Sequence, residues 1–184
     1  RPGPLGTSGR ESRFPLCDQP GVVYPVVMGP LKDLYQEIIL DHNRRPRNQG
    51  PVAGSTHAAD GRNPLCGDEI HVSLRLKEGR IEQVGFQGQA CAIAIASASL
   101  MTEAVRGKSE KQARETARRV LAAVDSTSRN ETLAGEGDLA ALEAVGDYPG
   151  RIKCAILAWS AFLCALDGGG EVNTELTAKR DNYE

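Results

Sequence analysis

The sequence is short of aromatic residues, of long apolar runs and of net charge. Only 4% of its 184 residues are aromatic, so a core must be built mostly from Ala, Val, Leu and Ile. No uninterrupted apolar run approaches the roughly 20 residues of a membrane-spanning helix, and we expect no membrane partner. The formal net charge of −2 argues against a general electrostatic grip on nucleic acid. These shortages favour an ordinary globular protein.

The sequence also lacks a disulfide framework. Its cysteines are odd in number and sparse, at Cys17, Cys66, Cys91, Cys154 and Cys164. The early apolar stretch 22–28 is short and interrupted by a proline, so we expect no secretory signal. We therefore expect a reducing, cytoplasmic compartment, where grouped cysteines are more often metal ligands or nucleophiles than disulfides.

The length predicts about one domain. Residues 1–27 begin with a stretch rich in Pro, Gly and Ser that lacks hydrophobic periodicity, and we interpret them as a disordered leader or an expression remnant. The domain is expected over residues 28–168. Residues 169–184, which follow the last predicted helix, are expected to form a polar C-terminal tail.

The first predicted elements are a helix and a hairpin. The helix runs from near Leu31 to just before a proline, with an inner face formed by Leu31, Leu34, Tyr35 and Ile38. Apolar and polar residues alternate over Ile70–Lys77, which indicates a strand with one buried face. Glu78 and Gly79 form a two-residue turn, and Arg80–Gln87 returns as the second strand. Residues 55–60 have only a weak strand pattern.

The chain from Cys91 onward is predicted to be helical. An apolar helix ends at Gly107, and an S-x-x-Q capping box at Ser109 opens the next helix. Asp138 is expected to cap a short helix, and Arg151–Leu166 forms a final apolar helix. A hairpin followed by helices indicates an α+β fold rather than alternating βαβ units.

Three cysteines lie where chemistry is plausible. Cys66 is in a loop flanked by Pro and Gly, Cys91 opens the buried helix, and Cys154 is expected in the first turn of the last helix. A helix N-terminus lowers the pKa of a cysteine, and the thiolate is the form that binds metal or attacks sulfur. The alternative is that these cysteines are small buried hydrophobes, which is our interpretation of Cys164.

Cys66, Gly67 and Asp68 suggest a metal site. Glycine lets the backbone bend so that its two neighbours can reach one ion. Three thiolates and one carboxylate make a four-ligand set that suits zinc, although the spacing alone is a weak signal. Arg151 would lie close to a metal held by Cys154, and a plain surface role for it is equally open. The histidines at positions 42, 57 and 71 are interpreted as surface or structural residues.

Four ordered segments resemble SufU proteins, which are relatives of the iron–sulfur scaffold IscU. The segments are LYQEIILDHNRRPRNQG, NPLCGDEIHVSL, GFQGQACAIAIASASLM and GDYPGRIKCAILAW, and the resemblance covers residues 28–166. IscU-type scaffolds carry a histidine before the third cysteine, where this chain has Lys153. The long segment Ser109–Gly146 fits an insertion of SufU proteins, so both details favour the SufU branch.

The resemblance implies an IscU-like fold, with a three-stranded antiparallel sheet packed against helices and residues 55–60 as its third strand. It also implies a zinc-dependent sulfurtransferase, in which zinc is held by Cys66, Asp68, Cys91 and Cys154, with Arg151 nearby. Cys66 would accept persulfide sulfur from a PLP-dependent cysteine desulfurase of the SufS type. The sulfur would then pass to a downstream iron–sulfur scaffold.

Two other functions stay open at this point. The chain could be a scaffold of the IscU type, on which three thiolates and a carboxylate hold an iron–sulfur cluster. Lys153 disfavours this alternative, because the neighbouring histidine ligand is absent. The zinc site could also be purely structural, within an interaction module.

Overall fold

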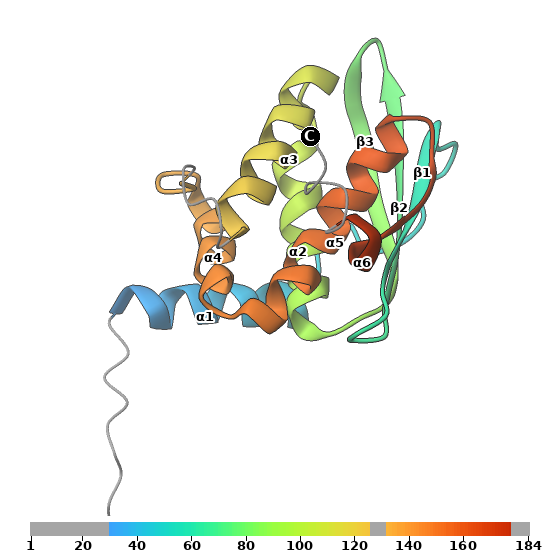
Figure 1. Ribbon diagram of the computed structural model, residues 1–184. Helices are drawn as coiled ribbons and strands as arrows, with labels where there is room; N and C mark the ends of the chain where they lie inside the picture. Colours follow the sequence, from blue (N-terminus) through green and yellow to red (C-terminus); the bar gives the residue numbers. More distant parts are fainter. Residues whose placement is uncertain (1–29, 126–131, 178–184) are drawn as a thin grey trace, which may run out of the picture.

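The computed structural model describes residues 30–125 and 132–177 (Figure 1). The predicted leader over residues 1–27 and part of the loop before Asp138 lie outside this range. The elements follow in the order α1 (Pro30–Arg44), β1 (His57–Asn63), β2 (Asp68–Lys77), β3 (Arg80–Gln89), α2 (Ala92–Val105), α3 (Glu110–Val124), η1 (Gly137–Leu139), α4 (Ala140–Glu143), η2 (Ala144–Asp147), α5 (Pro149–Leu166), β4 (Gly170–Asn173) and α6 (Thr174–Thr177). The α+β class predicted from the sequence is confirmed.

The sheet has four strands rather than three, in the order β3-β2-β1-β4. β1, β2 and β3 are antiparallel neighbours, whereas β4 pairs in parallel with β1 from Ala59↔Gly170 to Arg62↔Asn173. β4 comes from the segment expected to be a polar tail. Its four residues carry no hydrophobic alternation, and its pairing depends on α5 returning the chain to the edge of β1. The sequence pattern therefore could not reveal it.

The β2–β3 hairpin is built as the sequence predicts. Glu78 and Gly79 have φ values of 50° and 72°, and such a pair of left-handed residues matches the twist of the two strands. The buried face of β2 consists of Ile70, Val72 and Leu74, which are at most 1% exposed. This face packs under α5.

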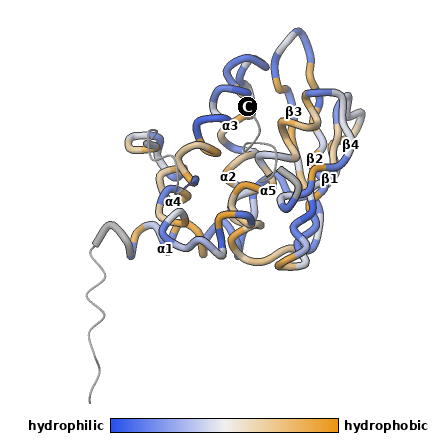
Figure 2. The backbone as a smooth tube through the Cα atoms, in the orientation of Figure 1, coloured by the Kyte–Doolittle hydropathy of each residue, from blue (hydrophilic) through white to orange (hydrophobic). Residues whose placement is uncertain are grey.

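Two apolar helices, α2 and α5, form the centre of the core. Figure 2 shows hydrophobic residues along both helices in the interior. Trp159 and Phe162 of α5 are fully buried, and α5 lies against β1, β2, α2 and α3. By length and composition alone α5 could cross a membrane, but half of it is buried within the protein, as expected for a core helix.

The inner face of α1 differs from the prediction. Leu34 is 50% exposed, whereas Ile39 and His42 are buried, with Tyr35 and Ile38 partly covered. The buried stripe is therefore rotated toward His42. The reason is a polar contact: Nδ1 of His42 lies 2.8 Å from the hydroxyl of a serine in α2. An apolar count along α1 does not detect this kind of burial.

The two predicted helix starts have different outcomes. The capping box of α3 is confirmed: Ser109 Oγ accepts from the Gln112 N–H, and the Gln112 side chain accepts from the Ser109 N–H. Asp138 is not a cap, because it lies inside η1, which has no side-chain cap. Its carboxylate instead lies 3.7 Å from Nε2 of His42.

Candidate metal centre

Four elements meet at one end of the sheet. β1 ends at Asn63, β2 begins at Asp68, α2 is capped by Cys91, and α5 carries Cys154. The loop between β1 and β2 carries Cys66. The end of the sheet thus gathers residues that lie up to 91 positions apart in the sequence.

The loop turns tightly over the end of the hairpin. Asn63 and Asp68 are paired across β1 and β2, and the Cys66 N–H donates to the Asn63 carbonyl at 3.2 Å. Gly67 has a φ of 68°, a conformation that glycine adopts without strain. This bend returns the chain to Asp68 directly after Cys66. The backbone bend predicted at Gly67 is therefore confirmed.

Three of the predicted ligands lie within reach of one ion. The ligand atoms of Cys66, Asp68 and Cys154 all lie within 4.8 Å of one another. The two sulfur atoms are 3.3 Å apart. Cys66 is exposed, whereas Asp68 is 1% exposed and Cys154 is fully buried. The cluster therefore has an open side at Cys66 and a closed side at Cys154.

Cys91 contributes to the cluster through its backbone. Its N–H donates to Oδ1 of Asp68 at 2.7 Å, which ties the start of α2 to the start of β2. Its sulfur is not part of the three-atom group found in the described residues. The structure thus places Cys91 next to Asp68 through its backbone, and its role as a fourth ligand stays a prediction.

The electrostatics of Cys154 differ from the prediction. α5 begins at Pro149, so Cys154 lies in the second turn and not in the first. Burial raises the pKa of its thiol, and hydrogen bonds with Cys66, Asp68 and Cys91 raise it further. The lowered pKa that the sequence predicts for a cysteine at a helix N-terminus is therefore not found at Cys154.

The donor set fits zinc. The buried carboxylate of Asp68 accepts one hydrogen bond on each oxygen, from the Cys91 N–H and the Asn63 amide, and a carboxylate has further lone pairs that can bind a cation. Here two sulfur atoms lie beside it, and sulfur with one carboxylate oxygen is a set that zinc accepts in tetrahedral sites. Cys66, Asp68 and Cys154, with Cys91 alongside, are the residues that would hold the ion.

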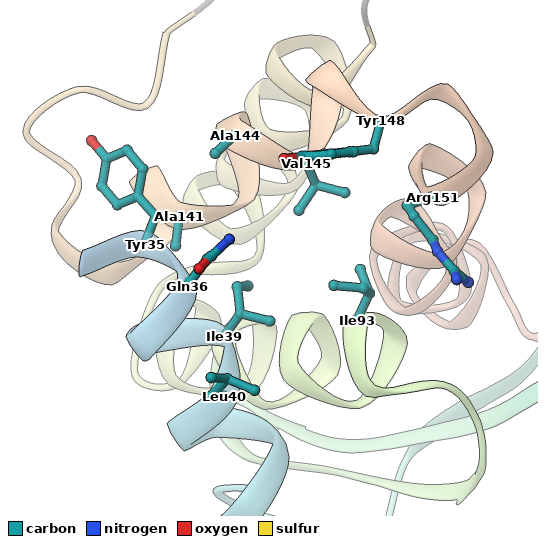
Figure 3. Close-up of a pocket in the computed structure, with 10 residues that line it drawn as sticks. All are labelled: Tyr35, Gln36, Ile39, Leu40, Ile93, Ala141, Ala144, Val145, Tyr148 and Arg151. Carbon is teal, nitrogen blue, oxygen red and sulfur yellow. The ribbon is translucent and has the colours of Figure 1, made fainter. Parts of the chain in front are cut away.

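Arg151 links this cluster to a neighbouring cavity. Its Nη1 lies 3.9 Å from the Cys66 sulfur, and a hydrogen bond to Cys154 with the charges of the thiolates raises its pKa. Its stem lines a cavity of about 500 Å³ between α1, α2 and η2. In Figure 3 the guanidinium points away from the centre of this cavity. Leu65 and Tyr148, 74% and 52% exposed, add exposed apolar surface in the adjacent loops.

The remaining candidates lie outside the cluster. His71 is on the solvent side of β2 and contacts Asp60, with Nδ1 and Oδ1 2.8 Å apart. His57 contacts the neighbouring Thr56, and Cys164 is half-buried in α5. Sequence reasoning missed Asn63, whose amide contacts both Asp68 and Cys154. Its place before the Pro-Leu-Cys-Gly-Asp loop was the available signal.

A small sheet is covered by helices, and thiols and a carboxylate converge at one of its ends; comparison with known proteins relates this arrangement to iron–sulfur cluster assembly proteins of the SufU and IscU type. Residues 34–155 match the NifU-like N-terminal domain, and the chain belongs to this family.

Two relatives illustrate the two branches. The chain is 37% identical over 131 residues to the zinc-dependent sulfurtransferase SufU of Bacillus subtilis (strain 168), covering 71% of this chain and 88% of that protein. It is 35% identical over 141 residues to the iron–sulfur cluster assembly scaffold protein IscU of Streptococcus pyogenes serotype M1, covering 77% and 87%. The resemblance to SufU seen in the sequence is confirmed.

A solved structure agrees with the fold. The crystal structure of a putative iron–sulfur cluster assembly scaffold protein for the SUF system, from Fervidobacterium islandicum AW-1, superposes with a TM-score of 0.66 at 28% identity. The match covers 71% of this chain and 94% of that chain.

Proposed function

We propose that this chain is a zinc-dependent sulfurtransferase of iron–sulfur cluster assembly. Cys66 accepts persulfide sulfur from a PLP-dependent cysteine desulfurase of the SufS type, and the sulfur then passes to a downstream iron–sulfur scaffold. One observation carries the proposal: two thiols lie 3.3 Å apart, and only Cys66 of this pair is exposed. A partner can reach Cys66, while Cys154 and Asp68 stay covered.

Zinc would be held by Cys66, Asp68, Cys91 and Cys154, and when bound it keeps these thiols deprotonated at neutral pH. The Cys66 thiolate attacks the outer sulfur of the donor persulfide. A new S–S bond forms on Cys66, the S–S bond of the donor breaks, and the donor cysteine leaves as a thiolate. The guanidinium of Arg151, 3.9 Å from the Cys66 sulfur, stabilises the negative charge during this exchange.

Mapping the transferred sulfur tests the proposal. The zinc-loaded chain is mixed with a desulfurase and its substrate cysteine, quenched with an alkylating reagent and digested for mass spectrometry. We expect a persulfide on Cys66, and no acceptance by Cys66→Ser. The matched control is Cys164→Ser, a half-buried cysteine packed against the core, whose thiol donates to the Gly169 carbonyl. A persulfide on Cys91 or Cys154 and never on Cys66 would contradict the assignment.

A second candidate is a scaffold on which an iron–sulfur cluster is built. The likeness to IscU of Streptococcus pyogenes favours it. Lys153 weakens it, because its Nζ pairs with Glu175 of α6 at 2.6 Å and offers the cluster no ligand. Metal analysis of protein purified without added metal separates the two functions. One tight zinc per chain supports the transferase, whereas a brown sample with iron and sulfide supports the scaffold.

A further inference from the structure

Asn63, the last residue of β1, holds two side chains of the candidate metal centre. Its Nδ2 donates to Oδ2 of Asp68 at 3.1 Å and to the sulfur of Cys154 at 3.3 Å. All three side chains are buried, each at most 1% exposed. One amide nitrogen therefore connects a carboxylate of β2 to a sulfur of α5.

The orientation of this amide is fixed by its neighbours. A carboxylate and a thiolate are acceptors, so the NH₂ group and not the oxygen must face them. The oxygen Oδ1 is then buried and has no hydrogen-bond partner among the described residues. An unpaired buried acceptor is unfavourable, and an apolar residue would avoid it. The two hydrogen bonds donated by Nδ2 therefore explain why an amide lies at this position.

The Asn63 amide contacts the sulfur of one thiol and not that of the other. Its nitrogen reaches the sulfur of Cys154, whereas Cys66 contacts Asn63 through the backbone, by its N–H to the Asn63 carbonyl. The sulfur of Cys66 faces Arg151 at the exposed side. The Asn63 amide therefore ties the Cys154 sulfur to Asp68 and makes no contact with the Cys66 sulfur among the hydrogen bonds of the described residues.

We propose that Asn63 is a positioning residue that keeps Asp68 and Cys154 in place as permanent metal ligands and leaves Cys66 as the ligand that exchanges. This inference rests on the proposed function, because it assumes that the cluster holds a metal. It distinguishes the two ligands that Asn63 holds, Asp68 and Cys154, from Cys66, whose sulfur Asn63 does not hold. The amide that makes this distinction binds no metal itself.

Cobalt substitution tests the inference without a partner protein. Co²⁺ is loaded into the full chain, where thiolate ligands give a charge-transfer band, and affinity is measured by competition with a chelator. Asn63→Leu has nearly the size of asparagine and removes both contacts. We expect the band to move to lower energy, because the Cys154 thiolate loses its hydrogen bond, and the affinity to fall at least tenfold.

The matched control is Ser73→Ala. Ser73 is a buried polar residue of β2, 4% exposed, whose hydroxyl accepts from the Val52 N–H away from the centre. It should change neither the band nor the affinity. Circular dichroism of each metal-free variant reports folding. If Asn63→Leu does not fold, the smaller Asn63→Ser, whose hydroxyl is too short to reach both partners, replaces it.

The outcomes distinguish a failure of the role proposed for Asn63 from a failure of the metal centre. If the unaltered chain gives the charge-transfer band and the Asn63 variant keeps the same band and affinity, only the role of Asn63 is overturned. An unaltered chain that gives no thiolate band would overturn the metal centre, and with it both proposals. A shifted band and weaker binding in the Asn63 variant, with neither change in Ser73→Ala, would support the inference.

Discussion

Two polar clusters join distant parts of the chain, and they are held together in different ways. The first is the candidate metal centre of Cys66, Asp68, Cys91 and Cys154. Two of its side chains share a single amide donor, that of Asn63. The second is the His42 cluster, formed by His42, Ser99 and Thr102, which ties the end of α1 and the following loop to α2.

In the His42 cluster Nδ1 of the histidine is paired, whereas Nε2 is buried with no hydrogen-bond partner among the described residues and has the Glu103 and Asp138 carboxylates 3.8 and 3.7 Å away. Ser99 Oγ lies 2.8 Å from Nδ1 of His42 and accepts from the Arg47 N–H at 2.8 Å, while Thr102 Oγ1 donates to the Ser99 carbonyl. In the metal centre, the ligand atoms of two thiols and a buried carboxylate lie within 4.8 Å of one another. The comparison teaches that hydrogen bonds to a histidine tie helices together, whereas sulfur and carboxylate oxygen gathered within reach of one ion indicate a cation.

Asp68→Ala should give the largest effect, a loss of metal from the metal centre but not a change in the His42 cluster. We expect zinc affinity to fall at least about 100-fold, because the buried oxygen ligand disappears and the Cys91 N–H loses its partner. Chelator competition measures the affinity. The control is Asp60→Ala, an exposed carboxylate on β1 that contacts His71. Normal zinc content and full sulfur transfer in Asp68→Ala would show that this carboxylate is not a ligand.

Removal of zinc from the unaltered chain should give the next largest effect. The ligands come from a loop, a strand and two helices, so metal binding contributes to folding stability. Free zinc at 1,000 times its Kd stabilises a protein by about 4 kcal/mol. For a chain of this size that corresponds to roughly 10 °C in Tm. Calorimetry with and without chelator measures the shift, and the Asp68→Ala protein should respond much less to chelator because its zinc is bound more weakly.

The local parts of the fold and site could be predicted from the sequence. The alternation over Ile70–Lys77 and the capping box at Ser109 are short-range patterns that the structure repeats. The glycine between Cys66 and Asp68 likewise indicates a bend by its position alone. Each of these features depends on neighbours within a few residues, and such neighbours are visible in a sequence.

The features that could not be predicted depend on contacts between distant residues. His42 lies near a helix end and could be interpreted only as a surface or structural residue, and its burial is decided by Ser99, 57 positions later. Asn63 acquires its role from Cys154, 91 positions away. The strand β4 pairs with β1 only after α5 has crossed the sheet. No local sequence pattern predicts these contacts between distant residues.

His42→Ala should affect stability and leave metal binding unchanged. We expect the free energy of unfolding to fall by about 2–3 kcal/mol, because a buried side chain and its hydrogen bond are lost and the Ser99 hydroxyl keeps only its bond from the Arg47 N–H. Urea unfolding measures this change, and chelator competition should give the zinc affinity of the unaltered chain. His71→Ala, an exposed histidine of β2, is the control, with an expected change below about 0.5 kcal/mol. A loss of zinc affinity in His42→Ala would mean that the two clusters are coupled.

The smallest expected effect is a pH dependence that belongs to the His42 cluster. Burial lowers the pKa of His42 below its ordinary value of 6.5, and the charge of Arg47 lowers it further, while Glu103 and Asp138 oppose both. Below pH 6.5 the unfolded chain therefore binds a proton at this position that the folded chain resists. The stability due to neutral His42 is fully present above pH 6.5 and is lost as the pH falls toward the folded pKa. Urea unfolding of metal-free protein, compared with His42→Asn at each pH between 5 and 8, isolates this contribution. The difference between the two proteins should be constant above neutrality and shrink toward pH 5. Parallel curves over the whole range would show that His42 does not titrate differently in the folded and unfolded chains.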